Sequence, residues 1–148
     1  MLFRSYVPPF QVLDFTVVVE RRDGTSTRAE ATVKVEVNGE QLHTASDGSG
    51  PVNALDRALR KALGAFYPQL DAVHLVDYKV RILDGASATA AKTRVVIESV
   101  AGGEAWSTMG VGENIIAASA TALADSLEYA LRRSGGSTSR RPERAVPR

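Results

Sequence analysis

The chain carries an internal repeat with an offset of 62 to 64 residues, present in two copies. Residues 14–19 are echoed by 77–82, residues 33–36 by 95–98, and the glycine pattern of 48–50 by 110–112. Leu59 and Leu63 are echoed by Leu123 and Leu127. A repeat constrains the whole architecture, and two copies are too few for a solenoid. We therefore expect two related halves that close on each other about a pseudo-two-fold axis.

The first copy has the pattern of three strands and a helix. Residues 15–20 are rich in β-branched side chains, residues 27–37 alternate with period 2, and residues 40–45 return after the hairpin signal Asn38-Gly39. Residues 48–50 should break the chain, and a helix should extend from Pro51 to Pro68. The predicted buried stripe of this helix is Val52, Leu55, Leu59, Leu63 and Phe66, with Arg57, Arg60 and Lys61 facing away.

The second copy repeats this order. Strands are predicted at 74–83, 93–100 and 104–109, with a hairpin turn at Gly102-Gly103 and a break at Gly110 and Gly112. The second helix has a stripe from Ile116 to Leu131 and should end at Gly135-Gly136. Its small residues predict close approach to another element: Ala118, Ser119, Ala122 and Ser126.

The expected fold class is α+β, with two pseudo-symmetric βββα halves at residues 10–69 and 70–133, each a three-stranded antiparallel sheet plus a helix. Residues 1–9 form an N-terminal extension, and residues 134–148 form a disordered basic tail. One helix covers only one face of a sheet, and a half of this size buries little alone. The uncovered faces therefore predict a homodimer.

Composition argues against several classes of function. The tail has a net charge of +3, which leaves −2 for the rest because the whole chain is +1, so we expect no nucleic-acid partner. No apolar run approaches the ~20 residues of a membrane span, and the N-terminus makes a poor signal peptide. There are no cysteines, which suits a reducing compartment. We expect a cytoplasmic protein with no membrane partner.

The residues that carry chemistry are sparse. His43 and His74 are the only histidines, and neither lies at helix-turn spacing from another metal ligand. Residues 46–50 lack the base that a nucleophile elbow needs. We therefore expect no catalytic residue, no metal site and no cofactor.

One local feature has functional content, namely the repeated junction of strand, Gly-x-Gly and helix. A helix N-terminus has unpaired N–H groups and a partial positive charge, and glycine lets a ligand approach the backbone. No basic residue flanks residues 48–52, which favours a carboxylate over a phosphate. A plain turn is the alternative interpretation. Apolar neighbours that could receive a branched aliphatic side chain are Val52, Leu75, Tyr78 and Ile82.

Residues 48–55 resemble the Gly-x-Gly-Pro-Val-Asp-Ala motif in the C-terminal regulatory domain of the 2-isopropylmalate synthase and citramalate synthase family. The segments 75–83, 91–99, 106–116 and 124–129 resemble the citramalate synthase branch of that family. The resemblance covers about residues 10–133. Two departures stand out, since Asn53 replaces the usual Asp and Ala88 stands where related segments have Gly.

The resemblance implies a dimeric domain that binds an end-product amino acid and thereby inhibits a catalytic barrel condensing acetyl-CoA with a 2-oxo acid. Isoleucine is the favoured effector here and leucine the second, with a barrel domain as a possible partner in trans. The effector-binding residues that the resemblance and the junction together predict are Gly48, Ser49, Gly50, Val52, Asn53, Leu75, Tyr78, Ile82, Thr89 and Ala90. A stand-alone branched-chain amino-acid sensor, a purely structural dimerisation domain and a nucleic-acid module remain alternatives.

Overall fold

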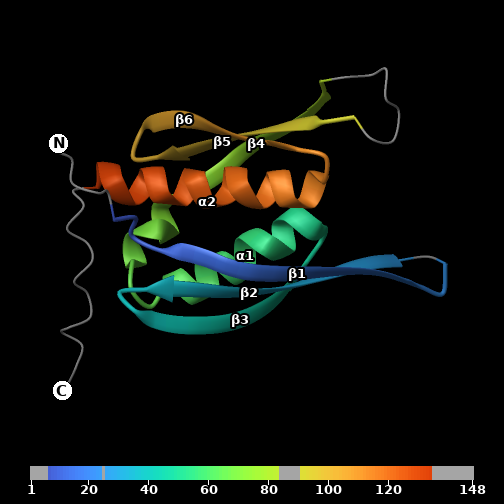
Figure 1. Ribbon diagram of the computed structural model, residues 1–148, viewed down its shortest axis with the longest axis horizontal. Coiled ribbons are helices and arrows are strands. Elements are labelled where there is room, and N and C mark those ends of the chain that lie inside the picture. Colours follow the sequence, from blue (N-terminus) through green and yellow to red (C-terminus); the bar gives the residue numbers. More distant parts are fainter. Residues whose placement is uncertain (1–6, 25, 84–90, 135–148) are drawn as a thin grey trace.

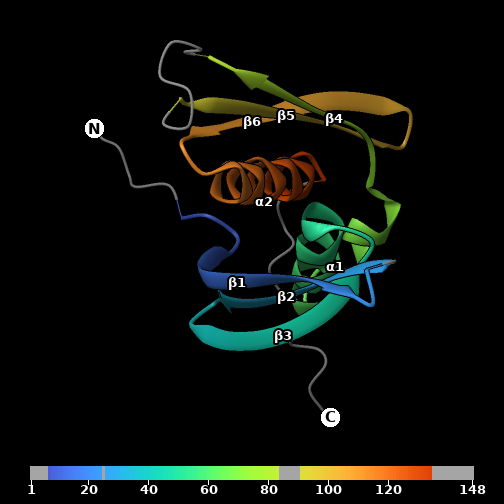
Figure 2. The same cartoon turned by 90° about the vertical axis from the view of Figure 1, so that its right-hand side faces the viewer.

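The computed structural model describes residues 7–24, 26–83 and 91–134. These residues form two sheets with two helices between them, so that the molecule has three layers (Figures 1 and 2). Helix α1 contacts β2 and β3, helix α2 contacts β5 and β6, and the two helices contact each other. The elements in chain order are β1 (Gln11–Arg22), β2 (Ser26–Val37), β3 (Glu40–Gly48), α1 (Pro51–Leu63), the 3-10 helix η1 (Pro68–Ala72), β4 (His74–Ile82), β5 (Thr93–Ala101), β6 (Glu104–Gly112) and α2 (Ile115–Arg133).

The predicted fold class is confirmed, because each half is a three-stranded antiparallel sheet followed by one helix. Sheet A has the order β1-β2-β3 and sheet B the order β4-β5-β6. In the β2–β3 and β5–β6 hairpins, Asn38 and Gly39 and then Gly102 and Gly103 all have positive φ. That conformation matches the type I′ turn that Asn-Gly and Gly-Gly favour, so the two predicted hairpin turns are confirmed.

The core forms where each helix covers the inner face of its own sheet. Along β2 the buried residues are Ala29, Ala31, Val33, Val35 and Val37, and along β5 they include Val95, Ile97, Ser99 and Ala101. The buried stripe of α1 includes Leu55, Leu59 and Leu63, and that of α2 includes Leu123, Leu127 and Leu131. The small residues of α2 are also buried, which confirms its close approach to sheet B. The outer faces of both sheets are uncovered (Figure 2).

Several boundaries differ from the prediction for local reasons. Strands β3 and β6 continue through Gly48 and Gly112, so the glycines at 48, 110 and 112 belong to strands. Gly48 and Gly110 let those strands approach the helices, because a Cβ at Gly48 would lie 2.6 Å from the Ala54 nitrogen and one at Gly110 would overlap the Ala118 carbonyl. The break predicted at residues 48–50 therefore begins only at Ser49, and the break predicted at Gly110 and Gly112 is wrong.

The end of α1 also differs from the prediction. The helix ends at Leu63, where Gly64 donates its N–H to the Arg60 carbonyl, and Pro68 begins η1 instead of ending α1. Phe66 is buried in the intervening turn. Register shifts at 12–14 in β1 and at 75–77 in β4 were also not predicted.

The structure corrects the alignment of the repeat. Strands β3 and β6 start at Glu40 and Glu104, and helices α1 and α2 start at Pro51 and Ile115, so the offset is 64 there. The offset of 63 between β1 and β4 is confirmed by their matching register shifts. Gly48 is therefore equivalent to Gly112, and Gly50 is equivalent to Asn114.

The N-terminal extension and the tail lie largely outside the described residues. At the start of the first half Phe10 is buried, and the Tyr67 hydroxyl donates to the Pro9 carbonyl at 2.9 Å. The chain from Pro9 onward is thus fixed to the turn after α1. No described helix has the length and apolar character that a membrane crossing requires. Among the described residues, no group of three or more His, Cys, Asp or Glu gathers as a metal site.

Candidate ligand-binding groove

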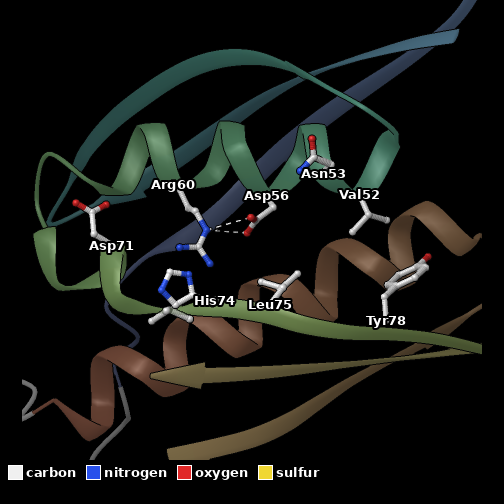
Figure 3. A pocket seen from close by; sticks show the side chains of 9 residues that line it. Val52, Asn53, Asp56, Arg60, Asp71, His74, Leu75 and Tyr78 are labelled. Carbon is white, nitrogen blue, oxygen red and sulfur yellow. Dashed lines mark hydrogen bonds and ion pairs between the residues drawn. The ribbon is translucent and has the colours of Figure 1, made fainter. Parts of the chain in front are cut away.

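A groove of about 500 Å³ lies between α1 of the first half and β4 of the second. We call it the α1–β4 groove (Figure 3). Its size is within the range of small-molecule sites. It is lined by Val52, Asn53, Asp56, Arg60, Asp71, Val73, His74, Leu75 and Tyr78. Since its walls come from different halves, the groove exists only when the halves are paired.

One end of the groove is the open N-terminus of α1. Gly50 is the N-cap residue and has no side chain to accept a hydrogen bond, and Pro51 has no N–H. Ala54 donates to the Gly50 carbonyl at 2.9 Å, but no described residue accepts the amide protons of Val52 and Asn53. Two N–H groups and the positive end of the helix dipole are therefore available to an anion.

The start of α2 shows the contrasting arrangement. Asn114 is the N-cap there, and its side-chain oxygen accepts the Ala117 N–H at 2.9 Å. The protein thus supplies the acceptor at α2 that it leaves out at α1. Asn53, in the first turn of α1, uses its side-chain oxygen to hold the preceding loop through the Ser49 N–H, at 3.0 Å.

The wall of the groove formed by β4 is largely apolar. Leu75 and the ring of Tyr78 lie along β4 and face Val52 on α1 (Figure 3). The Tyr78 hydroxyl lies 3.0 Å from the Ser119 hydroxyl, which itself donates to the Ile115 carbonyl. Because the single proton of Ser119 is used in that bond, Tyr78 is the donor. Tyr78 therefore connects the groove to the first turns of α2.

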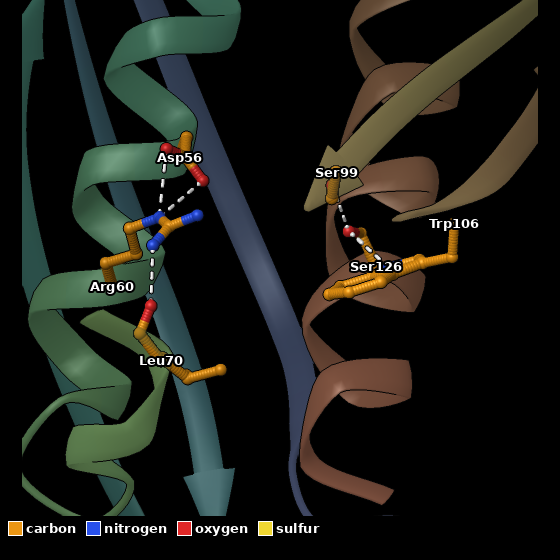
Figure 4. A network of polar contacts seen from close by, with 6 residues as sticks. All are labelled: Asp56, Arg60, Leu70, Ser99, Trp106 and Ser126. Carbon is orange, nitrogen blue, oxygen red and sulfur yellow. Dashed lines mark hydrogen bonds and ion pairs between the residues drawn. The ribbon is translucent and has the colours of Figure 1, made fainter. Parts of the chain in front are cut away.

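The other end of the groove is polar. The Arg60 Nε donates to both carboxylate oxygens of Asp56, at 3.0 and 3.1 Å, and its Nη1 donates to the Leu70 carbonyl at 2.9 Å (Figure 4). The Arg60 and Asp56 side chains are only 23% and 15% exposed, so this pair is held between α1 and η1. His74 and Asp71 also line this end of the groove (Figure 3).

The sequence profile of the LeuA allosteric (dimerisation) domain matches residues 2–131 of the chain. The chain belongs to the LeuA allosteric (dimerisation) domain family. The match includes both halves and all the described elements up to the last turn of α2. The α1–β4 groove is thus a feature of a LeuA domain.

Relatives of this LeuA domain are synthases. The chain is 53% identical over 115 residues to an (R)-citramalate synthase of Aquifex aeolicus, in an alignment covering 78% of the chain and 22% of the relative. It is 52% identical over 126 residues to an (R)-citramalate synthase of Geobacter sulfurreducens, covering 84% and 24%. A 2-isopropylmalate synthase of Aquifex aeolicus is 38% identical over 123 residues, covering 83% and 21%. The chain thus spans less than a quarter of the length of these relatives.

The groove of the LeuA domain brings together four of the ten residues proposed from sequence. Val52 and Asn53 come from α1, and Leu75 and Tyr78 from β4. Gly48, Ser49 and Gly50 do not line the groove but shape its end, since they hold the approach to α1. Ile82 lies outside the groove at the far end of β4 and is 63% exposed. Thr89 and Ala90 lie outside the described residues.

Sequence reasoning missed the polar part of the groove. Asp56, Arg60 and His74 line it, and Arg60 does not face away from the core as predicted. The spacing of Asp56 and Arg60, four residues apart on one helix, was a usable signal for their ion pair. The contact of Arg60 with η1 had no such signal, because η1 lies beyond the end of the helix.

A second groove of about 510 Å³ is the pseudo-symmetric counterpart of the first. We call it the β1–α2 groove, and its lining includes Val12 and Phe15, equivalent to Leu75 and Tyr78. Its helical wall, which also includes Thr121 and Asp125, differs at three equivalent positions. Where the α1–β4 groove has Asn53, Asp56 and Arg60, the β1–α2 groove has Ala117, Ala120 and Ala124. Because both halves fold alike, the polar wall of the first groove is not a requirement of the fold.

Proposed function

We propose that this chain is the amino-acid-binding regulatory part of a synthase of the citramalate or 2-isopropylmalate type. In this proposal a branched-chain amino acid binds in the α1–β4 groove and provides end-product feedback on an acetyl-CoA-dependent acyltransferase barrel. The family description names an allosteric and dimerising domain, and the relatives are named as synthases of these two types. A stand-alone sensor with the same groove is the alternative.

The observation that carries the proposal is the pattern of polarity along the α1–β4 groove. A free amino acid presents a carboxylate, an ammonium group and, in this class, a branched apolar side chain. The groove offers the unpaired N–H groups of Val52 and Asn53 at one end and the Asp56 carboxylate further along α1. The apolar wall of Leu75 and Tyr78 lies opposite. The equivalent groove in the same molecule has alanines at the positions of Asn53, Asp56 and Arg60.

The proposed binding mode follows from these groups. The carboxylate accepts the Val52 and Asn53 N–H groups, as anions do at open helix N-termini. The ammonium group lies toward Asp56, whose carboxylate oxygens can each accept a further hydrogen bond beside the one from Arg60. The aliphatic side chain packs on Leu75 and the Tyr78 ring. Binding there would act on both halves, since Val52 and Asn53 belong to the first half and Tyr78 to the second.

Isoleucine is the proposed effector, and leucine is the second choice. The relatives named (R)-citramalate synthase are 46% to 57% identical, whereas those named 2-isopropylmalate synthase are 33% to 38% identical. The two amino acids are isomers, so selectivity depends on where one methyl group packs. Such a difference is worth ~1–3 kcal/mol, and we expect isoleucine to bind ~10–100-fold more tightly.

Isothermal titration of the chain with isoleucine, leucine, alanine and isoleucine amide tests this proposal. Isoleucine should bind most tightly, alanine weakly because it lacks the side chain, and the amide weakly because it lacks the carboxylate. Leu75→Ala should weaken binding of isoleucine, whereas its counterpart Val12→Ala in the β1–α2 groove should not. Equal binding of leucine would contradict only the choice of effector. No binding of either branched amino acid would contradict the proposed function.

A further inference from the structure

The outer face of sheet B carries a group of basic side chains that the proposed function does not use. Arg81 of β4 and Arg94 of β5 are direct cross-strand partners, and Lys79 is paired with Val96 two residues along. Residues on one strand alternate between faces, so Lys79 and Arg81 point away from the face that carries Tyr78. This cluster is therefore separate from the α1–β4 groove.

These side chains line a groove of about 430 Å³, formed by Lys79, Val80, Arg81, Arg94 and Val96. We call it the cationic groove. Lys79 has an exposed ion pair with Asp77 at 3.4 Å. Among the described residues, neither Arg81 nor Arg94 has an ion-pair or hydrogen-bond partner. The carboxylates on this face of β4 and β5, Asp77 and Glu98, form the next cross-strand pair beyond Lys79.

The fold itself does not require this charge. The equivalent positions on the outer face of sheet A are Thr16, Val18, Glu30 and Thr32, and none of them is basic. Like charges directly opposite each other in an antiparallel sheet are destabilising. Sheet B thus accepts an unfavourable Arg81–Arg94 pairing that sheet A avoids.

We propose that the cationic groove binds a small oxyanion with two or more negative charges, either a phosphate ester or a polycarboxylate. Guanidinium groups hold phosphate and carboxylate through two parallel hydrogen bonds each, and two adjacent guanidinium groups suit a multiply charged anion. The bound anion would neutralise the Arg81–Arg94 repulsion, and Lys79 would supply a third positive charge. Val96, the cross-strand partner of Lys79 on the same face, would contact the organic part of the ligand.

Calorimetric titration with inorganic phosphate and with citrate, at constant low ionic strength balanced with chloride, tests the proposal. The exposed position predicts a Kd on the order of 0.1–1 mM for at least one of them. Arg94→Gln should raise that Kd about tenfold or more. The matched control is Arg28→Gln, an exposed arginine of sheet A paired with Asp47, and it should leave the Kd unchanged.

Thermal unfolding without added anion provides an independent readout. Removing one of two facing arginines relieves repulsion, so Arg94→Gln should melt at the same temperature as the parent or higher. Binding of phosphate alone would assign a phosphate ester, and binding of citrate alone a polycarboxylate. If neither anion binds at 10 mM, if Arg94→Gln binds as the parent does, or if Arg28→Gln loses binding equally, the proposal is wrong.

Discussion

Gly50 and Asn114 are the equivalent N-cap residues of α1 and α2, but only Asn114 accepts a hydrogen bond from a helix N–H group with its side chain. Asn114 satisfies an amide with its own side chain, and Gly50 leaves the corresponding end of α1 open. The backbone at Gly50 is extended, with φ −158°, and a Cβ there would meet nothing within 4 Å. Glycine is therefore not needed at this position for conformational reasons, and a side chain can be introduced to test the site.

Gly50→Asp should raise stability slightly and weaken the amino-acid ligand strongly. Aspartate is a favourable N-cap residue, worth a few tenths of a kcal/mol over glycine. Its carboxylate would occupy the amides that the ligand needs, which should cost ~1.5–3 kcal/mol, or roughly 10–150-fold in affinity. Calorimetry and urea denaturation measure the two effects. Gly50→Ala is the control, because it adds a Cβ without an acceptor and should bind like the parent. Unchanged affinity in Gly50→Asp would place the ligand carboxylate elsewhere.

Asp125 carries a negative charge that folding disfavours. It lines the β1–α2 groove, where burial, and secondarily the charge of Glu128, raise the pKa of its carboxyl above the ordinary 3.8. A raised pKa means that the folded state prefers the protonated form. The resulting stabilisation is present below pH 3.8 and is lost as the pH rises through the raised pKa.

Asp125→Asn should therefore be more stable than the parent at pH 7. The gain should be below about 1 kcal/mol, because the side chain is largely exposed and the helix propensities of the two residues are similar. Urea denaturation at pH 7 and at pH 3.5 measures the effect, and the difference should shrink at the lower pH, where the parent carboxyl is protonated. A difference of the same size at both values would mean that charge is not its cause.

At the scale of elements, each helix packs closely on the strand that precedes it, because a glycine of that strand leaves room for the helix backbone. In the second half that residue is Gly110, which lies against the Ala118 carbonyl. Two hydroxyls reinforce the same arrangement in both halves, since Thr44 and Thr108 donate to the carbonyls of Ala58 and Ala122, each at 2.8 Å. In each half, close backbone packing and a threonine hydrogen bond thus join the helix to the preceding strand, in addition to apolar burial.

Gly110→Ala should destabilise the second half by roughly 1–3 kcal/mol, because neither the strand nor the helix backbone can yield without disturbing the core. Gly112→Ala is the matched control two residues along the same strand. A Cβ at Gly112 meets nothing within 4 Å, so its effect should be near zero or slightly stabilising. Urea denaturation followed by the fluorescence of Trp106 reports both. Equal destabilisation by both substitutions would rule out the contact as the cause.

Much of the fold is predictable from sequence because strand faces repeat every two residues. Aligning Gly48 of the first copy with Gly110 of the second is wrong by two residues. Because the error is an even number, each side chain is still assigned to the correct face of its strand. The same error matters at the helix starts, where it hides the equivalence of Gly50 and Asn114. The groove itself could be predicted only in part, since Val52 and Leu75 are far apart in sequence and meet through the pairing of halves.

The buried side-chain hydrogen bonds of the second half could not be predicted from the sequence. Ser99 and Ser126 are fully buried with their hydroxyls 2.7 Å apart, and the Trp106 indole donates to Ser126 at 3.2 Å (Figure 4). The equivalent positions for the serines in the first half are Val35 and Ala62, which are apolar. Since either solution fills the space between strand and helix, the repeat pattern does not reveal which half uses hydrogen bonds.

At the scale of the whole molecule, the uncovered sheet faces and the family description both support a homodimer, which we expect in solution. Exposed apolar side chains concentrate on the edge strands β1, β4 and β6, among them Val19, Val76, Val80, Ile82, Met109 and Val111. Light scattering at micromolar concentration should give twice the protomer mass of 15.8 kDa. A mass of one protomer would contradict this prediction.

Each of the two inter-half grooves takes its helix from one half and its strand from the other. A single βββα unit could therefore line neither groove, whereas two identical units paired as a dimer would line two identical grooves. Two units joined in one chain have no such enforced identity, because a substitution in one copy does not change both sites. In this chain the two sites do differ, since the three polar residues on the helical wall of the α1–β4 groove are alanines at the equivalent positions of the β1–α2 groove.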